Sequence, residues 1–195
     1  TPGVDQDSIG GYLDVFVSKF YPGGGSLVYN TFIGGISWEL GYGLAVTEKG
    51  EAIVSGFSQS TDFPVTSGAY QTSRGGGDTE GFLLKLSEAG DSLLFSTHIG
   101  GNDREYFYDL ALADNGDVYL AGYTQSSDFP VTSAAYDTSY AGSGDGVILK
   151  MNSTGTNLIY STLLGGINFD LINSLALQDD GQLWVGGYTS STAYP

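Results

Sequence analysis

One unit of about 65 residues recurs along the chain, and this repeat limits the fold more than any other feature. The run Asp-Phe-Pro-Val-Thr-Ser at 62–67 returns at 128–133, and the glycine pair 34/35 returns at 100/101 and 165/166. Lys19 returns as Lys85 and Lys150 with matching shifts. A fixed period of this kind is the signature of repeat architectures, so the chain is predicted to consist of copies of one supersecondary unit.

Each copy predicts four short strands, which we letter a, b, c and d in chain order. In the middle copy we expect strands at about 105–112, 117–123, 145–151 and 157–164. Glycine-containing turns at 48–51, 114–117 and 179–182 join a to b, and similar turns at 21–25, 87–91 and 152–156 join c to d. Glycine supplies the positive φ that tight hairpins need. No segment has helical spacing long enough to compete.

The predicted strands b, c and d are apolar on both sides of the pleat, as at 52–54, 82–84 and 158–160. A sheet with one wet face would instead alternate apolar and polar residues. Sheets covered on both faces without helices must stack on other sheets, and radial stacking of four-stranded sheets does this. We therefore predict an all-β chain built of antiparallel β-propeller blades.

The repeat divides the chain, a single part-propeller domain over 1–195, into a c–d half blade at 1–35, blades at 36–101 and 102–166, and an a–b half blade at 167–195. Both ends fall in the loop between b and c, so the half blades, with strands at about 13–34 and 170–189, together make one split blade. Three blades are too few to close, because propellers typically have four to eight. Either two chains form a homodimer that closes a six-bladed ring, or the chain is part of a longer parent chain. We favour the latter, which is compatible with dimerisation.

Three segments carry a family resemblance: Tyr-Ser-Thr-Leu-Leu-Gly-Gly at 160–166, Gly-Asp-Val-Tyr-Leu-Ala-Gly-Tyr-Thr at 116–124, and Ser-Asp-Phe-Pro-Val-Thr at 127–132. They resemble the SBBP (seven-bladed β-propeller) repeat of bacterial proteins over nearly the whole chain. The resemblance implies a secreted or cell-surface location, and it brings no common catalytic activity. The chain departs from the pattern at 193–195, where Ala-Tyr-Pro replaces Asp-Phe-Pro.

The composition argues against several partners. The formal net charge of −16 repels phosphate backbones and anionic membrane surfaces, so we expect no nucleic-acid partner. No apolar run approaches the length of a membrane span, so no membrane insertion is expected. Without cysteine the chain has neither a disulfide framework nor a Cys-ligated metal site. We expect no cofactor, with Ca²⁺ as the alternative because carboxylate oxygens bind it.

In an a–b–c–d meander the d–a and b–c loops emerge on one face, and this face carries most of the sequence variety. Rigid elements that present variable loops favour ligand binding. The candidate ligand-binding residues follow the three glycine pairs: Trp38, Glu39, Arg104, Glu105, Phe169 and Asp170. The exposed aromatic rings can stack on sugars, or the loops can pack on themselves.

Three of the six cations occupy one repeated position, which predicts structural ion pairs. Burying an unpaired lysine costs several kcal/mol. We expect the lysines Lys19, Lys85 and Lys150 to pair with one of two repeated acid sets: Asp14, Glu80 and Asp145, or Glu39, Glu105 and Asp170. The alternative role for the acids is to bind Ca²⁺ or another metal.

The residues offer little for catalysis. His98 is the only histidine and lies on a predicted d strand, and there is no cysteine nucleophile. The sequence thus predicts a non-catalytic extracellular β-propeller module, an interaction or adhesion scaffold that binds an unidentified protein or glycan through its d–a and b–c loop face. The alternative is a carbohydrate-binding, lectin-like propeller assembled from several chains, and the third hypothesis is a fragment of a polysaccharide lyase or hydrolase.

Overall fold

The computed structural model describes residue 3 and residues 5–195, which form twelve antiparallel strands in four sheets without a helix. The prediction of an all-β chain is confirmed. Residues 1, 2 and 4, at the start of the expected segment 1–35, lie outside the described residues. The described chain has no helix of the length and apolarity that crossing a membrane requires.

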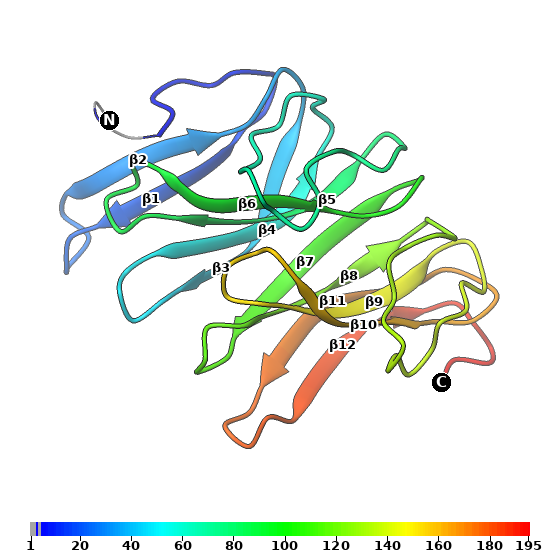
Figure 1. The fold of residues 1–195 in the computed structure, drawn as a ribbon. Helices are drawn as coiled ribbons and strands as arrows, with labels where there is room; N and C mark the ends of the chain where they lie inside the picture. Colours follow the sequence, from blue (N-terminus) through cyan, green and yellow to red (C-terminus); the bar gives the residue numbers. More distant parts are fainter. Residues whose placement is uncertain (1–2, 4) are drawn as a thin grey trace.

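The four sheets follow one another along the chain (Figure 1). Sheet 1 contains β1 (Val15–Phe20) and β2 (Leu27–Ile33). Sheet 2 contains β3 (Glu39–Val46), β4 (Ala52–Ser58), β5 (Glu80–Leu86) and β6 (Leu93–Ile99). Sheet 3 contains β7 (Glu105–Leu112), β8 (Val118–Thr124), β9 (Asp145–Met151) and β10 (Leu158–Leu164). Sheet 4 contains β11 (Asp170–Leu177) and β12 (Leu183–Thr189).

The hairpin turns have the geometry that their glycines predict. Gly50, Gly116 and Gly181 occupy the same place in three turns and have φ of 79°, 84° and 85°. Each amide donates a hydrogen bond of 2.8 to 2.9 Å to a carbonyl three residues earlier. Residues with a Cβ rarely adopt this left-handed conformation, so glycine fixes the position of the reversal.

A β-bulge interrupts the first strand of sheets 2, 3 and 4. The register shifts between residues 41 and 43, between 107 and 109, and between 172 and 174, which leaves Tyr42, Tyr108 and Asn173 as the extra residues. A bulge increases the local twist and changes the direction of a side chain. The side chains of these three residues therefore do not follow the alternation between the two faces of the sheet that the rest of the strand shows.

Sheet 2 buries apolar side chains on both faces, as its sequence predicts. One hydrophobic cluster joins Ile53 and Leu83 to residues of sheet 3, including Phe107 and Leu149. The other joins Val54, Leu84 and further residues of sheet 2 to sheet 1. Alternate residues of the same strands thus enter different cores, because successive side chains of a strand point to opposite faces.

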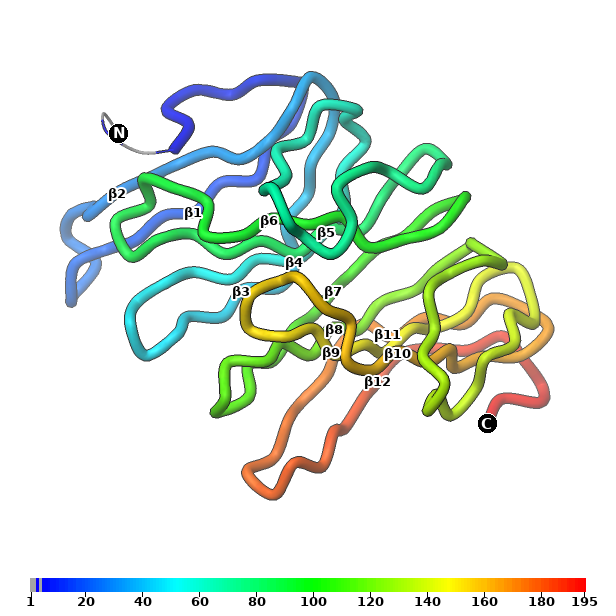
Figure 2. The backbone as a smooth tube through the Cα atoms, viewed as in Figure 1, coloured from blue at the N-terminus to red at the C-terminus, as the bar shows by residue number. Residues whose placement is uncertain are grey.

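The four sheets pack face to face in chain order. Figures 1 and 2 show sheet 1 and sheet 4 at opposite ends of this stack. The first strand of each later sheet lies across its predecessor: β7 contacts β3, β4 and β5, and β11 contacts β7, β8 and β9. The described residues form no closed ring.

Candidate functional site

The loops at one end of the sheets bind one another. Ser37 N donates to Ser60 Oγ at 2.8 Å, and Asp103 N donates to Ser126 Oγ at 2.7 Å. The third copy repeats this bond from Asn168 N to Ser191 Oγ at 3.0 Å. We call the segments 34–38, 59–79, 100–104, 125–144 and 165–169 the loop face.

Trp38, Arg104 and Phe169 occupy the same place in three copies, and the same backbone hydrogen bond holds each of them. Their carbonyl oxygens accept from the amides of residues 59, 125 and 190 at 2.8, 2.8 and 3.0 Å. Trp38 and Arg104 are exposed and Phe169 is half-buried. A fixed backbone therefore presents three chemically different side chains at the loop face.

Seven aromatic rings, with Phe169 among them, form a connected row, and we call them the aromatic row. Tyr42 and Tyr108 lie 5.0 Å apart between ring centroids, Phe57 and Tyr106 lie 4.5 Å apart, and Tyr106 and Tyr123 stack at 5.1 Å. The row continues from Tyr123 to Phe169 at 5.1 Å and to Tyr188 at 6.0 Å. It thus crosses from sheet 2 through sheet 3 to sheet 4.

Burial keeps the phenols of Tyr108 and Tyr123 neutral near neutral pH. Burial, with smaller contributions from neighbouring tyrosines, raises the pKa of Tyr123 to about 12 and also raises the pKa of Tyr108. Tyr42 and Tyr188, at opposite ends of the row, are 44% and 57% exposed. The row therefore offers accessible rings with polar hydroxyls, the amphipathic character that makes tyrosine frequent at binding surfaces.

Three of the predicted ligand-binding residues are buried. Glu39, Glu105 and Asp170 are at most 1% exposed and accept hydrogen bonds from hydroxyl groups on or just after the neighbouring strand. Ser58 Oγ donates to Glu39 at 2.7 Å, Thr124 Oγ1 donates to Glu105 at 2.6 Å, and Ser191 Oγ donates to Asp170 at 2.8 Å. A ligand on the loop face does not reach these carboxylates, so their expected role is corrected to a structural one.

The second set of acids holds the loops that precede the c strands. Gly10 N donates to Asp14 at 2.7 Å, Gly75 N donates to Glu80 at 2.9 Å, and Ala141 N donates to Asp145 at 2.9 Å. The two acid sets meet in pairs at the first glycine of each glycine pair. A Cβ on Gly34, for example, would lie 2.7 Å from oxygens of both Asp14 and Glu39.

Burial is the largest influence on the pKa of several of these acids. It raises the pKa of Glu105 to about 7, with a further contribution from Glu80, and it raises the pKa of Glu80 and Asp145. At Asp170 burial also acts upward, but hydrogen bonds from Thr189, Gly166 and Ser191 outweigh it and keep the pKa below its ordinary value. Glu105 Oε2 and Asp145 Oδ1 are buried oxygens without a hydrogen-bond donor.

The lysines pair with acids other than those expected. Lys85 and Lys150 contact Glu51 and Asp117 at 3.7 and 2.9 Å, and Lys19 contacts the exposed Glu88 at 3.7 Å. The first expected acid of each copy lies five residues before the lysine, at the start of the same strand or just before it. The second lies beside the first, on the next sheet. Five residues of a strand span roughly 16 Å and end on opposite faces, so the expected groups do not meet.

The described residues contain no cluster of three or more His, Cys, Asp or Glu arranged to hold a metal ion. His98 lies on β6, is 3% exposed and contacts the ring of Phe63. Burial, with help from the charge of Arg74, lowers its pKa to about 4. This environment keeps the imidazole neutral and away from solvent.

No family model matches the chain, and no curated protein sequence matches it.

Sequence reasoning missed the aromatic row, although the repeat contains its signal. Phe57, Tyr123 and Tyr188 recur with shifts of 66 and 65, and Tyr42 and Tyr108 recur with a shift of 66. Recurrence placed these residues at equivalent positions of separate sheets. The bulges and the packing of one sheet across the next then bring them into contact.

Proposed function

We propose that the chain is a non-catalytic β-propeller module of a secreted or cell-surface protein that binds a protein or glycan through its loop face. The antiparallel four-stranded meanders, stacked face to face at a constant repeat, support the propeller interpretation. The location follows from the resemblance of the repeat motifs.

One observation carries the binding role: the same backbone hydrogen bond holds Trp38, Arg104 and Phe169 in three copies, while the side chain differs in each. A rigid scaffold with variable, accessible side chains is how binding loops are commonly built. The adjacent aromatic row adds tyrosine rings, and Trp, Tyr and Arg are the residues that dominate binding energy at interfaces.

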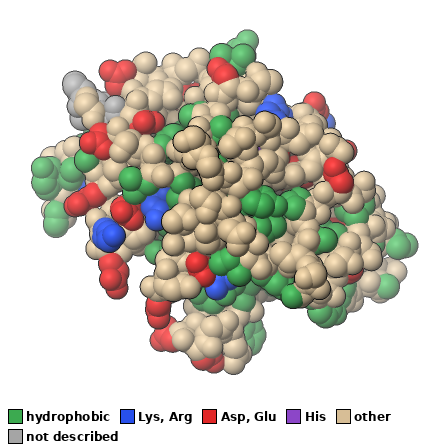
Figure 3. Space-filling view, in the orientation of Figure 1, with side chains coloured by type: hydrophobic (Ala, Val, Ile, Leu, Met, Phe, Trp, Pro, Cys, Tyr) green, Lys and Arg blue, Asp and Glu red, His purple; other side chains and the backbone are tan. Residues whose placement is uncertain are grey.

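The surface charge narrows the class of ligand. Acidic side chains are spread over the face seen in Figure 3, with few lysines and arginines among them. The net charge of −16 disfavours polyanions. A neutral or basic protein surface, or a neutral glycan, fits this chemistry.

Carbohydrate binding is the second candidate, favoured by the exposed ring of Trp38. A fragment of a polysaccharide lyase or hydrolase is disfavoured, because the repeated acids that could serve catalysis are buried and bonded to neutral donors. Polysaccharide turnover that is lost on Glu105→Gln would overturn the non-catalytic proposal.

The test uses an array of purified extracellular proteins and an array of glycans. Binding on either array should be lost in a Trp38→Ala, Phe169→Ala double variant. Tyr21→Ala is the matched control, because Tyr21 is 54% exposed but lies in a hairpin turn between β1 and β2, outside the loop face. Binding that survives the double variant contradicts the proposed site, and binding confined to the glycan array selects the lectin hypothesis.

A further inference from the structure

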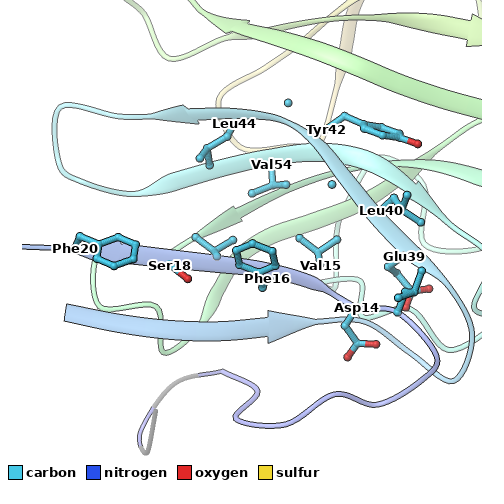
Figure 4. Close-up of a pocket in the computed structure, with 14 residues that line it drawn as sticks. Asp14, Val15, Phe16, Ser18, Phe20, Glu39, Leu40, Tyr42, Leu44 and Val54 are labelled. Atoms are coloured by element: carbon cyan, nitrogen blue, oxygen red, sulfur yellow. The ribbon is translucent and has the colours of Figure 1, made fainter. Parts of the chain in front are cut away.

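An open groove of about 620 Å³ lies between sheets 1 and 2. Figure 4 shows Val15 and Phe16 of β1 on one side of it, with Leu44 and Val54 of sheet 2 on the other. The groove runs along the free edge of β1, which pairs only with β2 in the described structure. The strands at the same repeat position, β5 and β9, are paired on both sides.

Phe16 and Phe20 of β1 are exposed because no described strand pairs with the free edge of β1. Residues at the same repeat positions on β5 and β9 are buried. Phe16 is 67% exposed, whereas the equivalent residues Phe82 and Val147 are fully buried. Phe20 is 56% exposed, whereas Leu86 and Met151 are fully buried. In sheets 2 and 3 an a–b hairpin covers these positions.

Strand β12 has the complementary free edge at the other end of the molecule. Its equivalents β4 and β8 are paired on both sides, but β12 pairs only with β11. Trp184 and Val185 are 62% and 36% exposed, whereas Ile53 and Val54 at the same positions are 0% and 4% exposed. The described residues thus contain one c–d hairpin without a neighbouring a–b hairpin and one a–b hairpin without a neighbouring c–d hairpin.

The outer edges of the sheets are already protected. Phe32, His98 and Leu163 donate backbone hydrogen bonds of 3.0, 3.0 and 3.1 Å to residues 6, 71 and 137 of the loops that run beside β2, β6 and β10. Unprotected strand edges promote association with other strands. Among the described strands, β1 and β12 alone have a free edge where their equivalents in sheets 2 and 3 are paired on both sides, so these two edges are the sites where a further strand fits.

We propose that β12 of a second copy of this chain pairs antiparallel with β1, so that two copies complete each other's half sheets. The two complete sheets define the register, because β4–β5 and β8–β9 pair equivalent residues. Carried over, this register sets Trp184 opposite Lys19, Val185 opposite Ser18 and Gly187 opposite Phe16.

The residues that this register brings together are compatible in size and in charge. In sheet 2 the ring of Phe82 lies over Gly56, and Gly187 leaves the same space for Phe16. In sheet 3 the ammonium group of Lys150 lies 5.2 Å from the ring centroid of Tyr119, and Lys19 has Trp184 at the corresponding place. Asp180, which holds Gln182 through two hydrogen bonds, adds a carboxylate near the same end of β12.

The symmetry of the assembly follows from the two edges. Each copy gives its a–b hairpin to the other, which is the self-complementary arrangement of a two-fold dimer. Two joined half sheets and the two complete sheets of each chain make six sheets, within the range of four to eight that closes a propeller. The joined hairpin also fills the groove beside Leu44, which is 62% exposed while its equivalent Leu110 is 7% exposed.

The molar mass of the 195-residue chain in solution tests the proposal first. Sedimentation equilibrium over a dilution series should give twice the chain's 20.4 kDa, and the Phe16→Asp or Val185→Asp variant should give 20.4 kDa. Ile167→Asp is the control, because Ile167 is 71% exposed but its equivalent Asn102 is also exposed. A monomer at all concentrations, or a mass unchanged by Phe16→Asp, overturns the proposal.

Disulfide trapping tests the register independently. The chain has no cysteine, so a Ser18→Cys, Val185→Cys variant contains only the two thiols under test. It should form a covalent dimer on oxidation, whereas Ser18→Cys with Gly186→Cys should not, because adjacent residues of a strand face opposite sides. Equal cross-linking in both variants, or none in the first, contradicts the proposed pairing. Both variants should remain folded by circular dichroism.

Discussion

The side chains of Glu80 and Glu105 meet at Gly100, although the two glutamates begin strands of different sheets. Both are fully buried. The glycine pair that marks the repeat therefore has a physical reason, since its first member leaves the space in which two carboxylates of neighbouring sheets approach each other. The same meeting occurs at Gly34 and Gly165.

Replacing Gly100 by alanine should destabilise the fold. The added Cβ would overlap oxygens of both glutamates, and overpacking of this kind costs about 1–3 kcal/mol. Gly25→Ala is the control, because a Cβ there meets no atom within 4 Å. Denaturant unfolding of the two variants measures the difference, and equal stabilities would contradict the crowding at Gly100.

The raised pKa of Glu105 predicts a stability that falls as pH increases. Burial raises its pKa from 4.5 to about 7, so the folded chain holds a proton that the unfolded chain releases. The stabilisation is fully present below pH 4.5 and is lost as pH rises through about 7. The difference in unfolding free energy between the native chain and Glu105→Gln, followed across this window, should report the loss. A difference that stays constant between pH 4.5 and pH 7 would contradict the buried environment of Glu105.

The stability that His98 contributes should change with pH in the opposite direction, increasing as pH rises. Burial and Arg74 lower its pKa from 6.5 to about 4, so folding favours the neutral ring. Its contribution is present above pH 6.5 and is lost as pH falls toward about 4. NMR titration of the only histidine should find a neutral imidazole until the lower value is approached. A midpoint near 6.5 would contradict its buried environment.

Lys150 and Asp117 should be energetically coupled. Their charged atoms lie 2.9 Å apart, and the side chains are only 21% and 11% exposed. A double-mutant cycle with Lys150→Met and Asp117→Asn should give a coupling of about 1 kcal/mol. The same cycle on Arg104 and Asp78, which are 45% and 73% exposed, should give a much weaker coupling because solvent screens exposed pairs.

Substitutions at different positions of the aromatic row should lower the stability of the fold by different amounts. Phe57→Ala, at a side chain that is 6% exposed, should cost about 3–5 kcal/mol because it leaves a cavity. Tyr106→Leu should cost about 1 kcal/mol, the loss of aromatic contacts, because leucine already occupies this position at Leu40 and Leu171. Thermal unfolding of both variants provides the comparison.

Much of the local structure was predictable because it depends on neighbours in sequence. The expected strands 105–112 and 145–151 coincide with β7 and β9, and the turn glycines lie where φ is positive. The partners of Lys85 and Lys150 were predicted wrongly, because spacing along one strand does not reveal which acid faces the lysine from an adjacent turn. Glu39 and Glu105 were predicted as ligand-binding candidates, and their burial was not predictable for the same reason, since their hydroxyl partners lie on the next strand.

The sequence alone determined the strands, their order within each meander and the presence of apolar side chains on both faces. These follow from the repeat period, from glycines at the reversals and from the two-residue periodicity of a strand. Only the tertiary structure decided which carboxylates are buried together, which rings join into a row and which strand edges remain open. Those features arise where one sheet lies across the next, so they depend on distances between residues that no spacing along the chain specifies.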